Sequence, residues 1–198
     1  GSHDMGAHHA ADYVVNNLPN ALATTLAMVK QDDESIISAI KAAFIQIDRE
    51  MWMGKIKYGS TTTGVLINRA EKKAILFNLG DSKTVRCAGG KILKSSVDHH
   101  PNNKEEADRI TNAGGVIINN RVNGQLAVSR AFGDFTFKTI KNAANVVEIN
   151  NIRGPVSALP DVVIFPLNLV ENIVLSSDAP YEISSFTDND FANYMQQK

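Results

Sequence analysis

The sequence predicts an α+β fold with antiparallel strands, and three observations lead to this class. Apolar residues recur at helical spacing over the first quarter of the chain. After Gly59 the pattern changes to short β-branched or apolar runs separated by glycine, asparagine and aspartate. Helical spacing returns only near residue 103 and again at the end, so helices and strands are grouped rather than alternating. This grouping argues against a doubly wound α/β fold with a parallel sheet.

Two helices are expected before the strands. Apolar positions predict the first over Ala10–Lys30, and Pro19 would interrupt it unless the proline opens a fresh turn or kinks the helix. The second has a clearer beginning, because Asp33 or Ser35 can cap it. Its apolar stripe then continues to a glycine that follows Met53, where the helix should end.

The strands are expected as a meander joined by hairpins. The runs Thr61–Ile67, Ala74–Phe77 and Thr84–Cys87 have strand composition, and turn residues separate them. The remaining elements are a helix over residues 103–113 capped by Asn103, a strand at 116–118, an irregular polar stretch at 132–155, strands at 162–165 and 173–175, and a last helix at 186–195.

Length and composition fit one domain over residues 1–198. The hydrophobic fraction is 43% and the charged fraction 21%, which are ordinary values for a soluble protein with a core. The net charge of −1 lacks the basic excess of nucleic-acid binders, so no nucleic-acid partner is expected. No apolar run approaches the roughly 20 residues that span a bilayer, and we expect no membrane insertion. The single cysteine, Cys87, excludes an internal disulfide and favours an intracellular location, cytoplasmic or nuclear.

Two carboxylates occupy similar places and form the first candidate site. Asp81 and Asp178 each follow an apolar run that reads as a buried strand, and Glu182 lies one helical turn beyond Asp178. If the two strands are neighbours, the carboxylates converge and require a cation or a raised pKa. An oxygen-only cluster suits Mg²⁺ or Mn²⁺. Alternatively, both are simply turn residues, since Asp is common after Gly or Ser.

Other candidate residues have plainer structural interpretations. Ser129 has no histidine base at a recognisable interval, so Arg130 and Asp134 beside it are interpreted as a buried Arg–Asp packing motif. The aromatic and methionine side chains of Met51-Trp-Met53 are assigned to the core rather than to a ligand platform. Three histidines crowd the N-terminus and could together bind zinc, although their spacing fixes no geometry: His3, His8 and His9.

Eight segments resemble, in chain order, the type 2C metal-dependent protein Ser/Thr phosphatases. The resemblance covers essentially the whole chain, and Leu126–Asp134, which reads Leu-Ala-Val-Ser-Arg-Ala-Phe-Gly-Asp, is its most specific part. The other segments are Gly59–Gly64, Asn78–Ser82, Asp98–Pro101, Arg109–Gly115, Arg121–Gly124, Ala158–Asp161 and Ser177–Ala179.

The resemblance implies a fold, a reaction and a set of metal ligands. The fold is a sandwich of two antiparallel β-sheets flanked by helix pairs. The reaction is hydrolysis of phosphoserine or phosphothreonine in a protein substrate by a metal-bound water, with Mg²⁺ or Mn²⁺ as cofactor. By position, Asp178 matches a metal-binding Asp, Asp81 an Asp of a third and weaker metal site, and Glu182 another acid of that site. Residues 138–155 correspond to a flap beside the active site.

The sequence also departs from the family pattern. The family's N-terminal Asp-Gly-His-Gly-Gly should precede the first helix, and here only Asp4, shifted by one residue, offers its carboxylate. Ala179 replaces the glycine after Asp178. The phosphate-binding arginine and the final Asp-Asn metal motif would lie outside residues 1–198. We therefore expect weak metal binding and little hydrolysis by this chain alone.

Three hypotheses follow for function. The first is a metal-dependent Ser/Thr phosphatase, and the second is a pseudophosphatase that keeps the sandwich and binds protein partners without hydrolysing phosphate. The third is a zinc-binding module built on the N-terminal histidines.

Overall fold

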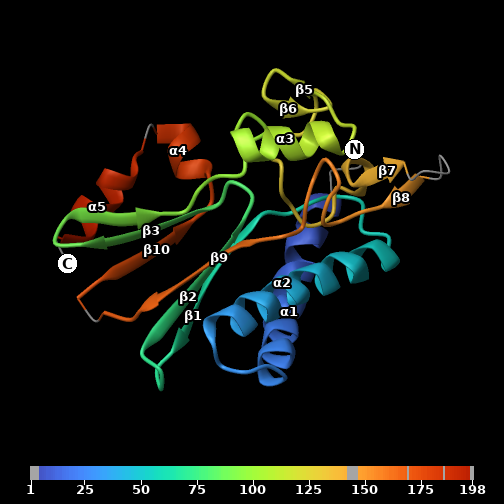
Figure 1. Cartoon of the computed structure of the whole chain (residues 1–198). Coiled ribbons are helices and arrows are strands. Elements are labelled where there is room, and N and C mark those ends of the chain that lie inside the picture. Colours follow the sequence, from blue (N-terminus) through green and yellow to red (C-terminus); the bar gives the residue numbers. More distant parts are fainter. Residues whose placement is uncertain (1–4, 142–146, 169, 185, 197–198) are drawn as a thin grey trace. The chain divides into compact units, whose positions relative to one another are not determined.

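The computed structural model describes residues 5–141, 147–168, 170–184 and 186–196. The chain forms two compact units (Figure 1). The first comprises Gly1–Thr61 and His99–Pro160, and the second comprises Thr62–Asp98 and Asp161–Lys198. The chain therefore passes through each unit twice. Within the described ranges, no helix is both long and apolar enough to cross a membrane.

The first unit begins with two helices that pack side by side, α1 (Met5–Ala27) and α2 (Asp33–Met53). Helix α1 runs through Pro19. The cap of α2 is Asp32 and not the predicted Asp33 or Ser35, and its carboxylate accepts a hydrogen bond of 2.9 Å from the Ser35 backbone N–H. The predicted end of α2 at Met53 is confirmed.

The rest of the first unit consists of short elements. Asn103 stands at the start of α3 as predicted, but its side chain makes no capping hydrogen bond. The stretch expected to be irregular contains a β-ribbon, β7–β8, so that expectation was wrong in part. The bounds are α3 (Lys104–Asn112), β5 (Ile117–Ile118), β6 (Arg121–Val122), the 3-10 helix η1 (Phe135–Phe137), β7 (Thr139–Lys141) and β8 (Val147–Ile149).

The core of the first unit joins α2 to the segment after β6. The rings of Phe44 and Phe132 stack with centroids 5.0 Å apart, and both side chains are fully buried. Met51 also lies in the core, as predicted. Trp52 and Met53 do not, because they are 50% and 71% exposed. Their assignment to the core was wrong: they are the last two residues of α2, and the Trp52 ring stays half exposed although it contacts Phe135.

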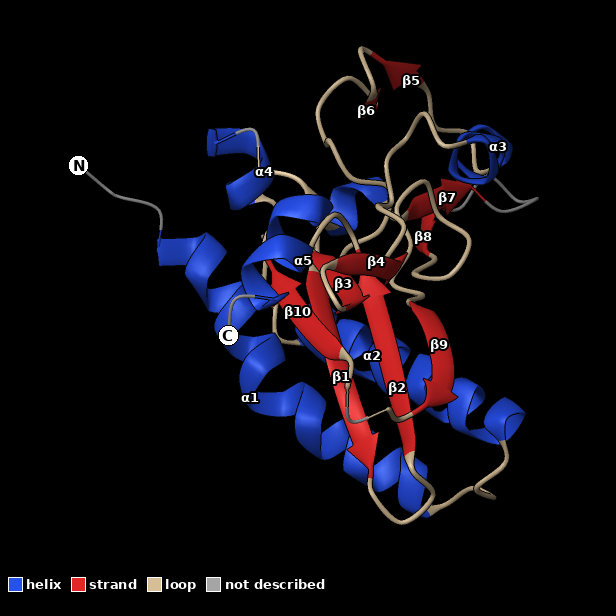
Figure 2. Cartoon of the chain, turned by 90° about the vertical axis from the view of Figure 1, so that its left-hand side faces the viewer, coloured by secondary structure: helices blue, strands red, loops and turns tan. Residues whose placement is uncertain are grey.

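The second unit contains two antiparallel three-stranded sheets, drawn red in Figure 2. The sheets face each other, since the Thr63 and Thr84 hydroxyl oxygens lie 2.6 Å apart across them. The first sheet has the strand order β1 (Thr62–Asn68), β2 (Lys73–Leu79), β9 (Asp161–Pro166), and the second has the order β10 (Asn172–Ser176), β3 (Lys83–Ala88), β4 (Lys91–Ser95). The helices of this unit are α4 (Ala179–Ser184) and α5 (Asp188–Gln196). Helix α5 packs on the second sheet, against β3 and β4.

The α+β class with two packed antiparallel sheets is confirmed, but the expected meander is not continuous. Strand β2 pairs with β1 and β9, whereas β3 pairs with β4 and β10. The chain crosses from one sheet to the other after β2, at Gly80, whose φ of +98° is readily adopted only by glycine. A hairpin turn and a crossover between sheets look alike in the sequence, because both require glycine and a polar residue between apolar runs.

Candidate functional site

The register of β3 and β10 brings the two predicted carboxylates to the same end of one sheet. Ser176 pairs with Lys83 as the last pair of this antiparallel ladder. Asp178 follows Ser176 by two residues, and Asp81 precedes Lys83 by two residues. The backbone therefore carries both residues beyond the same end of the ladder, which we call the acidic end. That they bind a metal ion stays a prediction.

The other two predicted ligands differ in how the structure places them. Glu182 lies in the first turn of α4, and its backbone N–H donates a hydrogen bond of 3.2 Å to the Asp178 carbonyl oxygen. It therefore follows Asp178 by one helical turn, as expected. Asp4 lies outside the described residues, as does His3 of the predicted zinc cluster.

The surroundings of the acidic end combine a cation with two further acids. The Lys83 ammonium lies 2.7 Å from an Asp98 carboxylate oxygen and 5.5 Å from the centre of the Tyr181 ring. The Tyr181 hydroxyl donates to Asp188 at 2.8 Å. Burial, and then the negative charge and hydrogen bond of Asp188, raise the pKa of Tyr181 well above its ordinary value. The phenol therefore stays protonated and serves as a hydrogen-bond donor that ties α4 to α5.

The donor set at the acidic end suits a hard cation but is incomplete in the part of the chain that the structure describes. Carboxylate oxygens are the ligands that Mg²⁺ and Mn²⁺ prefer. Within the described ranges, however, no three His, Cys, Asp or Glu side chains gather closely enough to hold a metal ion. Asp81 and Asp178 therefore stay predicted ligands, and we derive no catalytic step through a metal.

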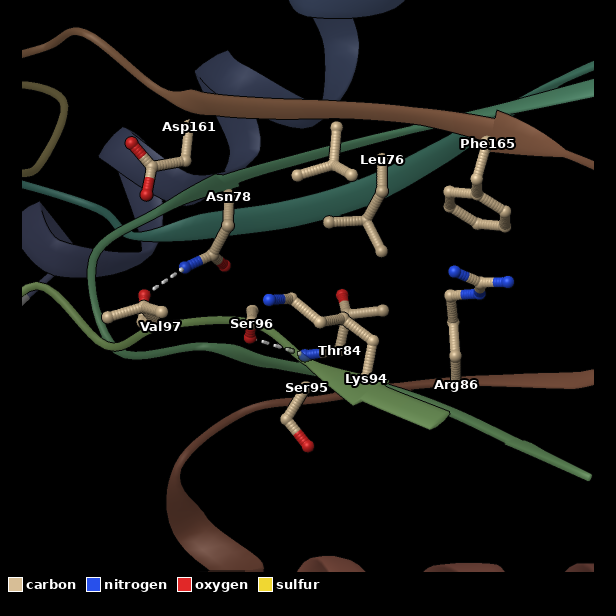
Figure 3. A pocket seen from close by; sticks show the side chains of 11 residues that line it. Leu76, Asn78, Thr84, Arg86, Lys94, Ser95, Ser96, Val97, Asp161 and Phe165 are labelled. Atoms are coloured by element: carbon tan, nitrogen blue, oxygen red, sulfur yellow. Dashed lines mark hydrogen bonds between the residues drawn. The ribbon is translucent and has the colours of Figure 1, made fainter. Parts of the chain in front are cut away.

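Asn78 supports the turn that leads to Asp81, a role the sequence did not reveal. Its side chain is buried near the end of β2, where its amide nitrogen donates to the carbonyl oxygens of Gly80 and Val97, each at 3.3 Å (Figure 3). The sequence did contain a sign of this role, because Asn78 is the polar residue in the otherwise apolar run Ala74–Leu79. A polar side chain in such a run needs partners, and here the partners are backbone carbonyls.

A cavity of about 140 Å³ lies between the two sheets, next to Asn78 (Figure 3). Arg86 enters it from β3 and stacks over the ring of Phe165, with the guanidinium carbon 3.6 Å from the ring centre. The same guanidinium lies 2.6 Å from a Glu171 carboxylate oxygen. The arginine charge is therefore neutralised inside the sandwich, and Arg86 acts as a packing residue.

A buried glutamate organises the most specific of the sequence motifs. The Glu106 carboxylate accepts hydrogen bonds from Arg130 at 2.6 Å, from Arg109 at 2.7 Å and from the Ser129 hydroxyl at 2.5 Å. Burial works against ionisation of Glu106, but Arg130, Ser129 and Arg109 together outweigh it and lower its pKa to about 2. The predicted pairing of Arg130 with Asp134 is wrong: Asp134 accepts a backbone hydrogen bond from Gly59 instead.

A second buried pair, Asp48 and Lys138, lies where the predicted flap begins. The Lys138 ammonium contacts an Asp48 carboxylate oxygen at 2.6 Å and donates to the Ala131 carbonyl at 2.9 Å. The Gly133 backbone N–H donates to the same Asp48 oxygen at 2.8 Å. Both side chains are fully buried, and this burial raises the pKa of Asp48 and lowers the pKa of Lys138.

The two buried clusters hold both ends of residues 138–155. Lys138 forms the beginning of this segment, and the Asn150 backbone N–H donates to the Lys138 carbonyl at 2.8 Å. At the other end, the Arg109 guanidinium donates to the carbonyl oxygens of Gly154 and Pro155. Glu106 and Lys138 therefore belong to the scaffold, a role that the sequence did not reveal. Arg130, which pairs with Glu106, and Asp134 belong to the scaffold too, as the sequence suggested.

Comparison with known proteins identifies relatives over most of the chain. The family model for Protein phosphatase 2C matches residues 2–183. Mouse protein phosphatase 1B is 33% identical over 163 residues, which are 77% of this chain and 39% of the relative. Human protein phosphatase 1A is 36% identical over 138 residues, which are 67% of this chain and 35% of the relative. The chain thus spans less than two fifths of the length of these relatives.

Solved structures with the same fold include two from different organisms. A sex determining protein of C. elegans superimposes with a TM-score of 0.75 at 22% identity, over 94% of this chain and 43% of that one. A phosphatase from Toxoplasma gondii superimposes with a TM-score of 0.69 at 21% identity, over 94% of this chain and 68% of that one. These likenesses support the fold, and the matched sequence supports the ancestry. The chain belongs to the protein phosphatase 2C family.

Proposed function

We propose that this chain serves, within its protein, as a domain that hydrolyses phosphoserine and phosphothreonine in protein substrates. Its membership in the protein phosphatase 2C family supports this reaction. The structural observation that carries the proposal is the register of β3 and β10, because it brings Asp81 and Asp178 to the same end of one sheet. Two carboxylates gathered at a sheet end favour a divalent cation, and a cation there favours a phosphate ester as substrate.

The chain's own residues have positioning roles in this proposal. Asn78 fixes the turn before Asp81, and the Lys83–Asp98 pair fixes the start of β3 beside it. Mg²⁺ or Mn²⁺ bound at the acidic end would supply positive charge for the phosphoryl oxygens. Since no group of three possible metal-ligating side chains gathers among the described residues, we propose that the isolated chain binds these ions weakly.

Calorimetric titration with Mn²⁺ tests the site directly. The isolated chain should bind weakly, with a dissociation constant above the micromolar range, and Asp178→Asn should reduce this binding by about tenfold or more because an anionic ligand is lost. Asp108→Asn, which changes an exposed carboxylate on α3, is the matched control and should bind as the unaltered chain does. Equal Mn²⁺ binding by the unaltered chain and Asp178→Asn would remove Asp178 from the proposed site.

Turnover of a phosphothreonine peptide tests the reaction. The isolated chain should show little Mn²⁺-dependent hydrolysis, because missing electrostatic contacts each cost on the order of a hundredfold in rate. A longer form of the protein that includes the flanking sequence should be active, and Asp178→Ala should abolish that activity. Continued inactivity of the longer form would favour the alternative, a pseudophosphatase that binds protein partners.

A further inference from the structure

The C-terminal end of α2 exposes an aromatic and apolar surface that the proposed phosphatase function does not use. Trp52 and Met53 are largely exposed, although both belong to the least polar residue types. The Trp52 indole rests on Phe135 in an edge-to-face arrangement, with ring centroids 5.2 Å apart. The indole is therefore held in a fixed place by a partner while one of its surfaces faces solvent.

Two adjacent hollows extend from these side chains. One has a volume of about 650 Å³ and lies between the end of α2 and the start of η1, with Trp52, Ile56 and Phe135 in its wall. The other, of about 610 Å³, lies along α2 and includes Ile152. Met53 lines both, so the two hollows meet at this side chain, and we call them together the α2-end groove. All of its residues belong to the first unit.

The rim of the α2-end groove is positively charged. Four exposed cations line it, and none of them forms an ion pair among the described residues: Lys41, Arg49, Lys55 and Lys57. The acid that lines it, Glu50, accepts hydrogen bonds from the Tyr13 hydroxyl and the Gln46 amide. Because the whole chain has a net charge of −1, this concentration of cations is a local feature.

The backbone at Lys55 adds a second observation. Lys55 has φ of +57°, in the left-handed region, while the neighbouring Gly54 has an ordinary helical φ of −74°. Glycine adopts the left-handed conformation with less strain than any other residue. The chain thus holds a lysine in the strained position with a glycine beside it, which is consistent with a role for the lysine side chain at this site.

We propose that the α2-end groove binds an acidic segment of a partner protein, with a bulky apolar side chain packed beside Trp52 and carboxylates against Lys55 and Lys57. Exposed aromatic side chains at the centre of a groove, with a charged rim, form the usual anatomy of a protein-binding hot spot. The charge of the rim selects an acidic segment over a neutral or basic one. The proposal concerns binding alone and does not depend on phosphatase activity.

Trp52 gives a direct readout, because it is the single tryptophan of the chain. The probe is a short synthetic peptide with a leucine flanked by glutamates, which carries no fluorophore of its own. Its addition to the intact chain should shift the Trp52 emission to shorter wavelength in a saturable manner. High salt should weaken the binding by about tenfold, since exposed charges are screened. A peptide with leucine replaced by serine, and one with glutamates replaced by lysines, should each bind at least about tenfold more weakly.

Matched variants separate the groove from nonspecific attraction. The double substitution Lys55→Glu and Lys57→Glu should weaken binding of the acidic peptide about tenfold or more. Both positions are exposed, so the variant should fold as the unaltered chain does. The control is Lys30→Glu with Lys91→Glu, two exposed lysines that do not line the groove, and it should bind as the unaltered chain does.

Three outcomes would overturn the proposal. The first is equal weakening by both double variants, and the second is a saturable response that does not distinguish the peptides. The third is a Trp52 emission already shifted by self-association in the absence of peptide, as judged by sedimentation, because the occupant would then be a second copy of the chain.

Discussion

The buried clusters of the first unit and the acidic end of the second unit differ in how their carboxylates are paired with cations. Glu106 and Asp48 are buried, and each has a cation within 2.7 Å. At the acidic end, the register instead places Asp81 and Asp178 beyond the same end of one ladder, while the neighbouring Lys83 is engaged with Asp98. A carboxylate neutralised inside the fold contributes to architecture, whereas carboxylates gathered at a sheet end call for a cation from outside. The comparison separates scaffold from site within one chain.

The largest expected effect is the loss of the Asp48–Lys138 pair. Asp48→Ala leaves the Lys138 ammonium buried without its counter-ion, and removing one partner of such a pair costs about 3–5 kcal/mol in the free energy of unfolding. Urea denaturation measures this loss. The control is Lys104→Met, which breaks the exposed Lys104–Asp108 pair and should change stability by about 0.5 kcal/mol or less. Similar losses in both variants would show that the buried cluster is not a scaffold.

A pH titration of stability should reveal the Glu106 cluster. Because the pKa of Glu106 is about 2 in the folded protein and near its ordinary value of 4.5 in the unfolded chain, its ionised form contributes stability above pH 4.5 that is lost as pH falls toward 2. The shift corresponds to about 3 kcal/mol. Measured by denaturation across this range, the unaltered chain should lose more stability than Glu106→Gln. Parallel pH profiles for the two proteins would contradict the assigned pKa.

The smallest expected effect concerns the turn before the acidic end. Asn78→Leu removes the hydrogen bonds to the Gly80 and Val97 carbonyls and should lower the free energy of unfolding by about 1–3 kcal/mol. Because the turn positions Asp81, Mn²⁺ binding should weaken as well. Asn16→Leu, at an exposed position on α1, is the matched control for both measurements. A destabilised Asn78→Leu protein with unchanged Mn²⁺ binding would limit Asn78 to the fold and separate the turn from the site.

Local sequence patterns predicted the helices α1, α2, α3 and α5 and six of the strands, but not β4, β6, β7, β8 or α4. The apolar stripe of α2 and its end at Met53 follow from helical spacing and the glycine that comes next. The positions of Asp81 and Asp178 after apolar strands were also visible, and their placement beyond the same end of one ladder required only that β3 and β10 be neighbours. These features depend on spacing along the chain, which the sequence contains in full.

Only the tertiary structure decided which distant residues meet. Gly80 could close a hairpin or carry the chain between sheets, and the second occurs because β9, more than eighty residues later, pairs with β2. Arg130 has Asp134 close by in the sequence, yet its partner is Glu106 on α3, and Trp52 is exposed although it follows the buried Met51. An arginine or an indole can be satisfied by many partners at little difference in local energy. The choice among them depends on the packing of the whole unit, and no short stretch of sequence contains that information.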